Sequence, residues 1–217
     1  MKYILISAAN LGAQLSPHFK ASEFYSTSPD RPKEHEIAEP LVLAAEILRT
    51  HFNKPWRITS TYRTEAHERR ILKAAGVPYF TSQHTKKKAF DSQPADLSAE
   101  TMKAIWLDFT TEGELYQKLR AVGITAFGIY NTFIHLDCRD DEFKAKRRDK
   151  WGLVARWDSR TGAARKVGNS WGAAWVSSQA GTTPPKPTSS PKPATKAPVA
   201  PPSFTPARRA SAATCSR

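Results

Sequence analysis

Two histidines and one aspartate are the side chains of this chain best suited to metal chemistry. In "SQHTKKKAFD" (residues 82–91), His84 and Asp91 stand seven positions apart, and His135 lies in "FIHLDCR" (133–139). Two imidazoles and a carboxylate often hold catalytic zinc, because three protein ligands leave a fourth position for water. Zinc lowers the pKa of that water from about 15.7 to roughly 7. Asp91 could instead cap a turn, and His135 could be an ordinary surface histidine, so residue type leaves both interpretations open.

Two predicted strands determine whether these side chains can meet. Successive side chains of a strand alternate between its faces. The apolar set of residues 133–139 should face the core, so the opposite face would carry Phe133, His135, Asp137 and Arg139. In "AFDS" (89–92), Phe90 should point inward and Asp91 outward. If the two strands are neighbours, His84, Asp91 and His135 can converge.

The remaining periodicity predicts a compact α+β domain. Helices are expected over 35–52, where Pro40 is tolerated only near the first turn, over 64–76 after Thr64, over 98–109 after Ser98, and over 113–123. Strands are expected over 56–63, 124–130 and 152–157, with a central, mostly antiparallel sheet, and the charged stretch 139–150 is expected to be a turn.

Composition separates a folded part from a tail. Residues 177–217 hold nine of the sixteen prolines, no acidic residue and one aromatic residue, so we expect a disordered tail. Six of the thirteen net positive charges lie in it, which leaves +7 for residues 1–176. Such basicity favours a polyanionic neighbourhood, whether nucleic acid, an anionic wall polymer or a membrane surface. We expect the main domain to span 15–160, with 161–176 at its edge.

The cysteines and the N-terminus add little about location. Cys138 and Cys215 give no disulfide framework. No apolar run reaches the roughly 20 residues of a membrane span. Residues 1–14 fit a poor secretory signal, and "YILIS" (3–7) fits a buried first strand at least as well.

Four motifs in order resemble the zinc D-Ala-D-Ala carboxypeptidase and endopeptidase family, which shares its fold with the hedgehog signalling domain. The motifs are "SPHFKASEF", "TSTYRTEAHERRI", "SQHTKKKAFD" and "GITAFGIYNTFIHLDCRD", and the resemblance covers about residues 15–157. The family pattern is S-x-H, two residues, G, x, A, x, D, followed later by F-x-H-x-D. Ser82, His84, Ala89 and Asp91 match the first part. The second part is matched by Phe133, His135 and Asp137.

The resemblance implies that His84, Asp91 and His135 ligate zinc. It also implies that Arg63, in "STYR", binds a carbonyl or carboxylate of the substrate, which suits a guanidinium that always keeps its charge. Without the family, a structural salt bridge would explain Arg63 as well. Ser82 and Tyr130 are further candidates for substrate binding.

This chain departs from the family pattern at two positions. Several members carry Glu or Asp three residues before the last histidine, where this chain has Thr132, which cannot act as a base. Asp137 could replace that base, or it could orient an imidazole instead. Lys87 stands where the family has glycine, so the backbone there must adopt or avoid a conformation that is easy for glycine. Lys86, Lys87 and Lys88 would form a solvated turn or rim the cleft.

The sequence therefore predicts a zinc peptidase that acts on peptidoglycan stem peptides or cross-links, with the tail as a tether to anionic wall polymer. The origin could be bacterial or phage, and the place of action the cell wall. A non-catalytic cell-wall-binding or signalling module is the alternative. Nucleic acid is a weaker candidate, because the tail lacks interleaved aromatic residues.

Overall fold

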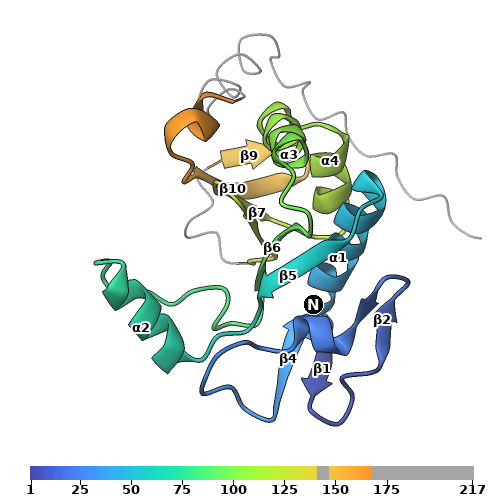
Figure 1. Ribbon diagram of the computed structural model, residues 1–217, viewed down its shortest axis with the longest axis vertical. Coiled ribbons are helices and arrows are strands. Elements are labelled where there is room, and N and C mark those ends of the chain that lie inside the picture. The colour runs from blue at the N-terminus through green and yellow to red at the C-terminus, as the bar shows by residue number, and fades with distance from the viewer. Residues whose placement is uncertain (141–146, 168–217) are drawn as a thin grey trace, which may run out of the picture. The chain divides into compact units, whose positions relative to one another are not determined.

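A computed structural model describes residues 1–140 and 147–167 of the chain. All of them fall within one compact unit, Met1–Gly181. The predicted tail, with Cys215, and most of the predicted domain edge lie outside the described residues. The α+β class is confirmed by helices and a mixed six-stranded sheet in the described ranges (Figure 1).

The helices begin and end close to their predicted positions, with one correction. They are α1 (Glu39–Phe52), α2 (Glu65–Ala74), α3 (Ala99–Thr111) and α4 (Glu114–Ala121), with 3-10 turns at Ala21–Phe24 and Gly162–Lys166. Thr64 caps α2, and Ser98 caps α3, as expected. The prediction that a helix spans 35–52 was wrong at its start, because residues 34–38 form a strand. Pro40 explains the boundary, since proline is tolerated only in the first turn of a helix.

The strands build one large sheet and two small ones. They are β1 (Tyr3–Ser7), β2 (Gln14–Ser16), β3 (Phe19–Lys20), β4 (Glu34–Ala38), β5 (Trp56–Ser60), β6 (Ala89–Pro94), β7 (Ala126–Ile129), β8 (Ile134–Asp137), β9 (Arg147–Asp149) and β10 (Gly152–Asp158). The large sheet has the order β5-β6-β8-β7-β10-β9. All its pairings are antiparallel except β7 with β10. The prediction of a turn throughout 139–150 was wrong at residues 147–149, which form β9.

The N-terminal residues form a strand at the margin of the domain. β1 pairs antiparallel with β4, and only Ile6 of its five residues is buried. The expectation of a buried strand is therefore right for the strand and wrong for the extent of burial. None of the helices in the described ranges has the length and apolar character that crossing a bilayer requires.

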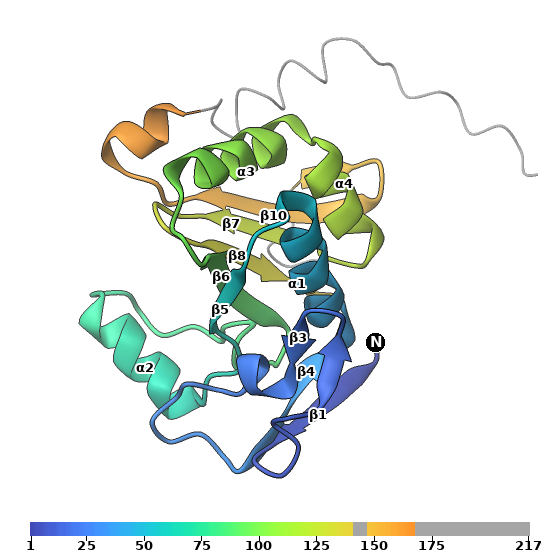
Figure 2. The same ribbon diagram turned by 45° about the vertical axis from the view of Figure 1, so that its right-hand side comes forward.

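The core lies on one face of the large sheet. Phe90, Phe127 and Leu136 point from their strands into one apolar cluster with buried side chains of α1, α3 and α4. In Figure 2 these three helices lie together, whereas α2 stands apart from them. The opposite face of β6 and β8 is thus left for polar side chains, as the alternation predicts.

Candidate metal centre and cleft

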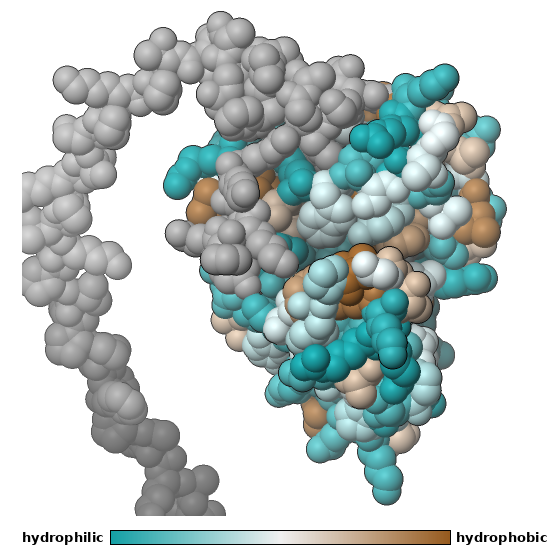
Figure 3. Space-filling view, turned by 90° about the vertical axis from the view of Figure 1, so that its left-hand side faces the viewer, coloured by the Kyte–Doolittle hydropathy of each residue, from teal (hydrophilic) through white to brown (hydrophobic). Residues whose placement is uncertain are grey.

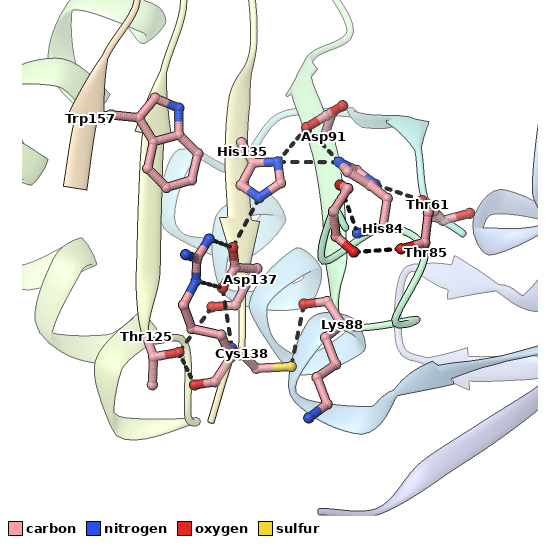
Figure 4. Close-up of polar contacts among 12 residues, drawn as sticks. Thr61, His84, Thr85, Lys88, Asp91, Thr125, His135, Asp137, Cys138 and Trp157 are labelled. Atoms are coloured by element: carbon pink, nitrogen blue, oxygen red, sulfur yellow. Dashed lines mark hydrogen bonds and ion pairs between the residues drawn. The ribbon is translucent and has the colours of Figure 1, made fainter. Parts of the chain in front are cut away.

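The pairing of β6 with β8 brings the predicted ligands together. In that register Asp91 lies directly opposite His135. His84 reaches the same point from the loop before β6. The ligand atoms of His84, Asp91 and His135 all lie within 4.8 Å of one another, and the three residues are buried. The predicted convergence is therefore confirmed (Figure 4).

The distances within this cluster suit a small tetrahedral cation. Nε2 of His84 lies 3.2 Å from Nδ1 of His135 and 3.3 Å from Oδ1 of Asp91, and the remaining separation, between His135 Nδ1 and Asp91 Oδ1, is 2.8 Å. Zinc bonds of about 2.0–2.2 Å in a tetrahedron place ligand atoms roughly 3.3–3.5 Å apart. The residues present therefore fit zinc after shifts of a few tenths of an ångström.

Each imidazole is oriented by a partner on its outer nitrogen. Nδ1 of His84 lies 2.6 Å from the carbonyl oxygen of Thr61, which can only accept, so this nitrogen carries the hydrogen and Nε2 presents its lone pair to the cluster. His135 is turned the other way round. Its Nε2 lies 3.1 Å from Oδ2 of Asp137, and its Nδ1 faces the cluster. Both arrangements are typical of histidines that ligate a metal.

Charge in the cluster is balanced tightly. Burial acts to lower the pKa of His135, but hydrogen bonds from the ring to Asp137 and Asp91 outweigh it and raise the pKa to about 9. Burial acts to raise the pKa of Asp91, yet the two histidines hold it well below its usual value. Burial lowers the pKa of His84, which Asp91 only partly offsets. Since a ligand nitrogen must be unprotonated, a proton has to leave His135 when a cation binds.

Asp137 lies where it can orient His135. Its side chain is completely buried, and Arg139 donates to both of its oxygens, with Nε at 2.8 Å from Oδ1. Burial acts to raise the pKa of Asp137, but hydrogen bonds from Arg139 and His135 lower it to about 2. Asp137 lies on the strand face opposite the core, as the alternation predicts, but other side chains cover that face at Asp137. This geometry favours the orienting role over the role of base.

Arg63 holds Asp91, a candidate metal ligand, and also lines the cleft. Its Nη2 donates to Oδ2 of Asp91 at 2.5 Å, its Nη1 lies 3.3 Å from Oε2 of Glu68, and its Nε donates to Ser60 at 2.8 Å. A guanidinium has five N–H groups, so two remain after these contacts. Arg63 can therefore fix the Asp91 carboxylate and still offer donors to a substrate.

The loop before β6 explains how a lysine replaces glycine. Lys87 adopts a left-handed backbone with φ of +65°, so it takes up the conformation that glycine would reach more easily. Its ammonium pairs with Glu36 at 3.1 Å, and that of Lys88 pairs with Asp140 at 2.7 Å. Neither lysine lines the cleft, and neither does Lys86. The alternative in which the three lysines rim the cleft is therefore wrong, and the expected solvated turn is right except at Lys88, whose side chain is only 13% exposed.

The other predicted residues lie at the same site. Ser82 lines the cleft, but its Oγ accepts from the backbone N–H of His84 at 3.2 Å and so helps to place that ligand. Tyr130 also lines the cleft and accepts from Nε1 of Trp157 at 3.0 Å. Thr132 is exposed in the turn before β8 and is not part of the lining.

A cleft of about 510 Å³ opens above the cluster. One side carries Ile71, Leu72 and Phe80, from α2 and the chain after it, and the other carries Tyr130, Phe133 and Trp157. Figure 3 shows the side of the molecule on which α2 lies, where hydrophobic side chains adjoin strongly hydrophilic ones. The cleft can therefore take an extended, partly apolar chain with its polar bond over the cluster.

The family comparison agrees with this arrangement. The model of the Peptidase M15 family matches residues 17–137. The chain belongs to this family. Membership makes it a peptidase of the metallopeptidase kind, and the matched segment includes His84, Asp91 and His135. Neither the curated proteins nor the solved structures gave a match. The hedgehog-like fold therefore stays a prediction.

Sequence reasoning missed several residues of the cleft. Glu68, Arg156 and Trp157 all line it. Glu68 lies in a quoted motif, but nothing in its spacing distinguishes it from Glu65, the other acid in the first turn of α2. Trp157 could have been found from the alternation along β10, had the pairing of β10 with β7 been known. The Thr61 carbonyl that orients His84 is a backbone group, which no side-chain pattern reveals.

Proposed function

We propose that this peptidase is zinc-dependent and hydrolyses peptide bonds of peptidoglycan stem peptides or cross-links, as a D-Ala-D-Ala carboxypeptidase or a murein endopeptidase. The observation that carries the proposal is the cluster of His84, Asp91 and His135 at the floor of the cleft, with the lone pairs of both rings able to face one point. Such a donor set leaves a position open for water, which a purely structural zinc site does not.

The chain's own residues would divide the work as follows. His84, Asp91 and His135 would hold the ion, and zinc there would supply a Lewis acid that polarises the scissile carbonyl and makes water nucleophilic at neutral pH. Thr61 and Asp137 would keep the two rings in the required orientation. Arg63 would hold Asp91 and direct its remaining N–H groups at a substrate carbonyl or carboxylate.

The lining of the cleft suits short anionic peptides. Arg63 and Arg139 line it, and the guanidinium carbon of Arg139 lies 5.7 Å from the centre of the Trp157 ring. The Arg156 guanidinium is buried elsewhere and pairs with Glu112. Peptidoglycan stem peptides carry carboxylates and small side chains, so basic groups would attract them and flat rings would pack against their backbone. This chemistry supports stem peptides as the substrate class. The same chemistry does not distinguish cleavage of a terminal peptide bond from cleavage of an internal one.

One departure favours a second candidate, a non-catalytic cell-wall-binding or signalling module. The position three residues before His135 is the exposed Thr132, which offers no carboxylate as base. A domain that had lost its base could still hold zinc and bind wall peptides.

Digestion of purified peptidoglycan tests the proposal. Wild type and a His135→Ala variant would be incubated with wall material of several chemotypes, with bound zinc measured on the same samples and released peptides identified by mass spectrometry. We expect zinc-dependent products from wild type and none from the variant. The product masses would identify the bond. Stoichiometric zinc without any product in any chemotype would refute catalysis and support the binding module.

A further inference from the structure

Glu68 is the second carboxylate of the cleft. Among the described residues that line the cleft, Asp91 and Glu68 are the two that carry a carboxylate, and Asp91 belongs to the metal cluster. Glu68 reaches the cleft from α2, and its residue is only 3% exposed. A buried carboxylate in a cleft is a costly group that usually has a partner or a task.

The two other candidates for a base are badly placed. Asp137 is enclosed, with its oxygens occupied by His135 and Arg139, and it does not line the cleft. Thr132 has no carboxylate, is exposed and does not line the cleft. A general base must lie within hydrogen-bond reach of the proton that it removes, directly or through one water. Neither residue meets this requirement from its observed place.

A single guanidinium connects Glu68 to the metal cluster. Arg63 places Nη1 at 3.3 Å from Oε2 of Glu68 and Nη2 at 2.5 Å from Oδ2 of Asp91. The two nitrogens are bonded to one carbon, so the carboxylate of Glu68 lies one guanidinium width from that of a metal ligand. In the described part of the chain, Oε1 of Glu68 has no hydrogen-bond or ion-pair partner. One oxygen is thus held in place while the other remains able to accept.

We propose that Glu68 is the general base of the hydrolysis, an inference that rests on the proposed peptidase function. The oxygen of a water molecule attacks the scissile carbonyl carbon, and one water proton passes to the Glu68 carboxylate. The C–N bond then breaks with its electron pair on nitrogen, and Glu68 returns the proton to that nitrogen. The second water proton follows when the new carboxyl group ionises, so the products are a carboxylate and an ammonium group.

Substitution can separate this role from a structural one. Glu68→Gln keeps an oxygen that accepts from Arg63 but cannot take up a proton at neutral pH. The full-length protein, loaded with zinc, would be given the disaccharide pentapeptide and its cross-linked dimer from peptidoglycan. Cleavage rate, zinc per chain and affinity for each peptide would be measured for wild type, Glu68→Gln and, as a matched control on the same helix, Glu65→Gln.

We expect Glu68→Gln to bind zinc and peptide as wild type does and to cleave at least about 100-fold more slowly, the usual range for loss of a general base. Glu65→Gln should behave as wild type, because Glu65 does not line the cleft. Cleavage by Glu68→Gln within about threefold of wild type would overturn the assignment. Loss of zinc in parallel with activity would also overturn it, since that result marks a structural partner of Arg63.

A second variant covers the case in which Glu68→Gln folds poorly. Glu68→Ala opens space for a small carboxylate, so added formate should raise its rate at least about tenfold and leave wild type unchanged. No response to formate would overturn the proposal. If wild type with bound zinc cleaves neither peptide, the proposed function itself fails and this inference fails with it. If wild type cleaves the peptides and the Glu68 variants cleave them equally fast, only the role of Glu68 is refuted and the proposed function stands.

Discussion

At the scale of single residues, the site depends on which nitrogen of each histidine is left for the cation. The carbonyl of Thr61 determines this for His84, and the carboxylate of Asp137 does so for His135. The two partners are not equivalent, because a carboxylate adds charge and so raises the basicity of the ring. The sequence left two roles open for Asp137, general base or orienting partner of His135. A variant of Asp137 can distinguish between them.

Asp137→Asn is predicted to weaken zinc binding by about 10- to 100-fold, because Asn keeps an acceptor for His135 but loses the charge. Cleavage at saturating zinc should stay within about tenfold of wild type, since Asp137 does not face the cleft. A competitive zinc titration together with the rate at full occupancy measures both quantities. A rate that falls more than 100-fold with the site filled would restore Asp137 as the base.

His35 is predicted to make the stability of the protein depend on pH. It stacks between Tyr25 and Tyr62, with ring centroids at 5.8 and 5.2 Å, and its Nε2 accepts from the backbone N–H of Ser26 at 3.0 Å. Burial, and to a smaller extent the charge of Lys87, lower the pKa of His35 below its usual value of 6.5. Below about pH 6.5 the unfolded chain gains a proton that the folded state resists, so stability falls as pH falls.

Urea unfolding at pH 7.5 and 5.5 checks this prediction. The free energy of unfolding should fall more for wild type than for His35→Gln, which keeps a neutral acceptor at the same place. Groups other than His35 contribute to both proteins and cancel in the comparison. Equal losses in the two proteins would show that His35 does not resist protonation.

At the scale of elements, alternation along strands was the most informative signal in the sequence. It placed His135 and Asp137 on one face of β8 and Ile134 and Leu136 on the other, and the structure agrees. Strand order could not be predicted in the same way, because the pairing of β6 with β8 joins segments that lie far apart in the chain. The convergence of the ligands therefore remained conditional until the structure showed the register.

The sequence-based predictions that were wrong lie where the local residue pattern favours one structure and contacts with distant parts of the chain favour another. Residues 34–38 have apolar spacing that suits a helix, but pairing with β1 makes them a strand. The role proposed for Glu68 could not be predicted from the sequence for the same reason. It depends on the contacts of Arg63 with Glu68 and Asp91, and these residues come from different elements. Lys87 was noticed because it breaks the family pattern, yet only the backbone conformation shows that lysine tolerates the place of glycine.

Gly128→Ala is predicted to disturb the cleft wall through β7 and β10. In their parallel register Gly128 lies beside Trp157, and a Cβ on Gly128 would lie 2.3 Å from Cε2 of that indole. The Trp157 ring in turn packs 5.1 Å from the ring of His135. We expect the variant to lose about 1–3 kcal/mol of stability, as overpacked sites do, and to cleave more slowly.

Urea unfolding followed by tryptophan fluorescence measures the effect of Gly128→Ala. Gly12→Ala is the matched control, because nothing lies within 4 Å of its added Cβ, and it should behave as wild type. If Gly128→Ala were as stable and active as this control, Trp157 would not be held by the close approach of the two strands.

At the scale of the whole molecule, the distribution of charge predicts how the proposed binding to cell wall depends on salt. Residues 177–217 carry six of the thirteen net positive charges. We expect binding to sacculi that bear anionic polymer to weaken between about 50 and 500 mM NaCl, because salt screens charge. Deletion of 177–217 should remove most of that salt-dependent binding in a pelleting assay. Retained, equally salt-sensitive binding would place the contact on residues 1–176.

The central claim is that one zinc ion, held by His84, Asp91 and His135, is required for peptide hydrolysis. The most direct test is to titrate the metal-free protein with zinc and to follow bound metal and peptide release from peptidoglycan on the same samples. The account predicts that release rises in proportion to zinc bound and levels off at one ion per chain, and that Asp91→Ala shows neither. Release that is unaffected by removal of the metal, or zinc bound at full strength by Asp91→Ala, would contradict it.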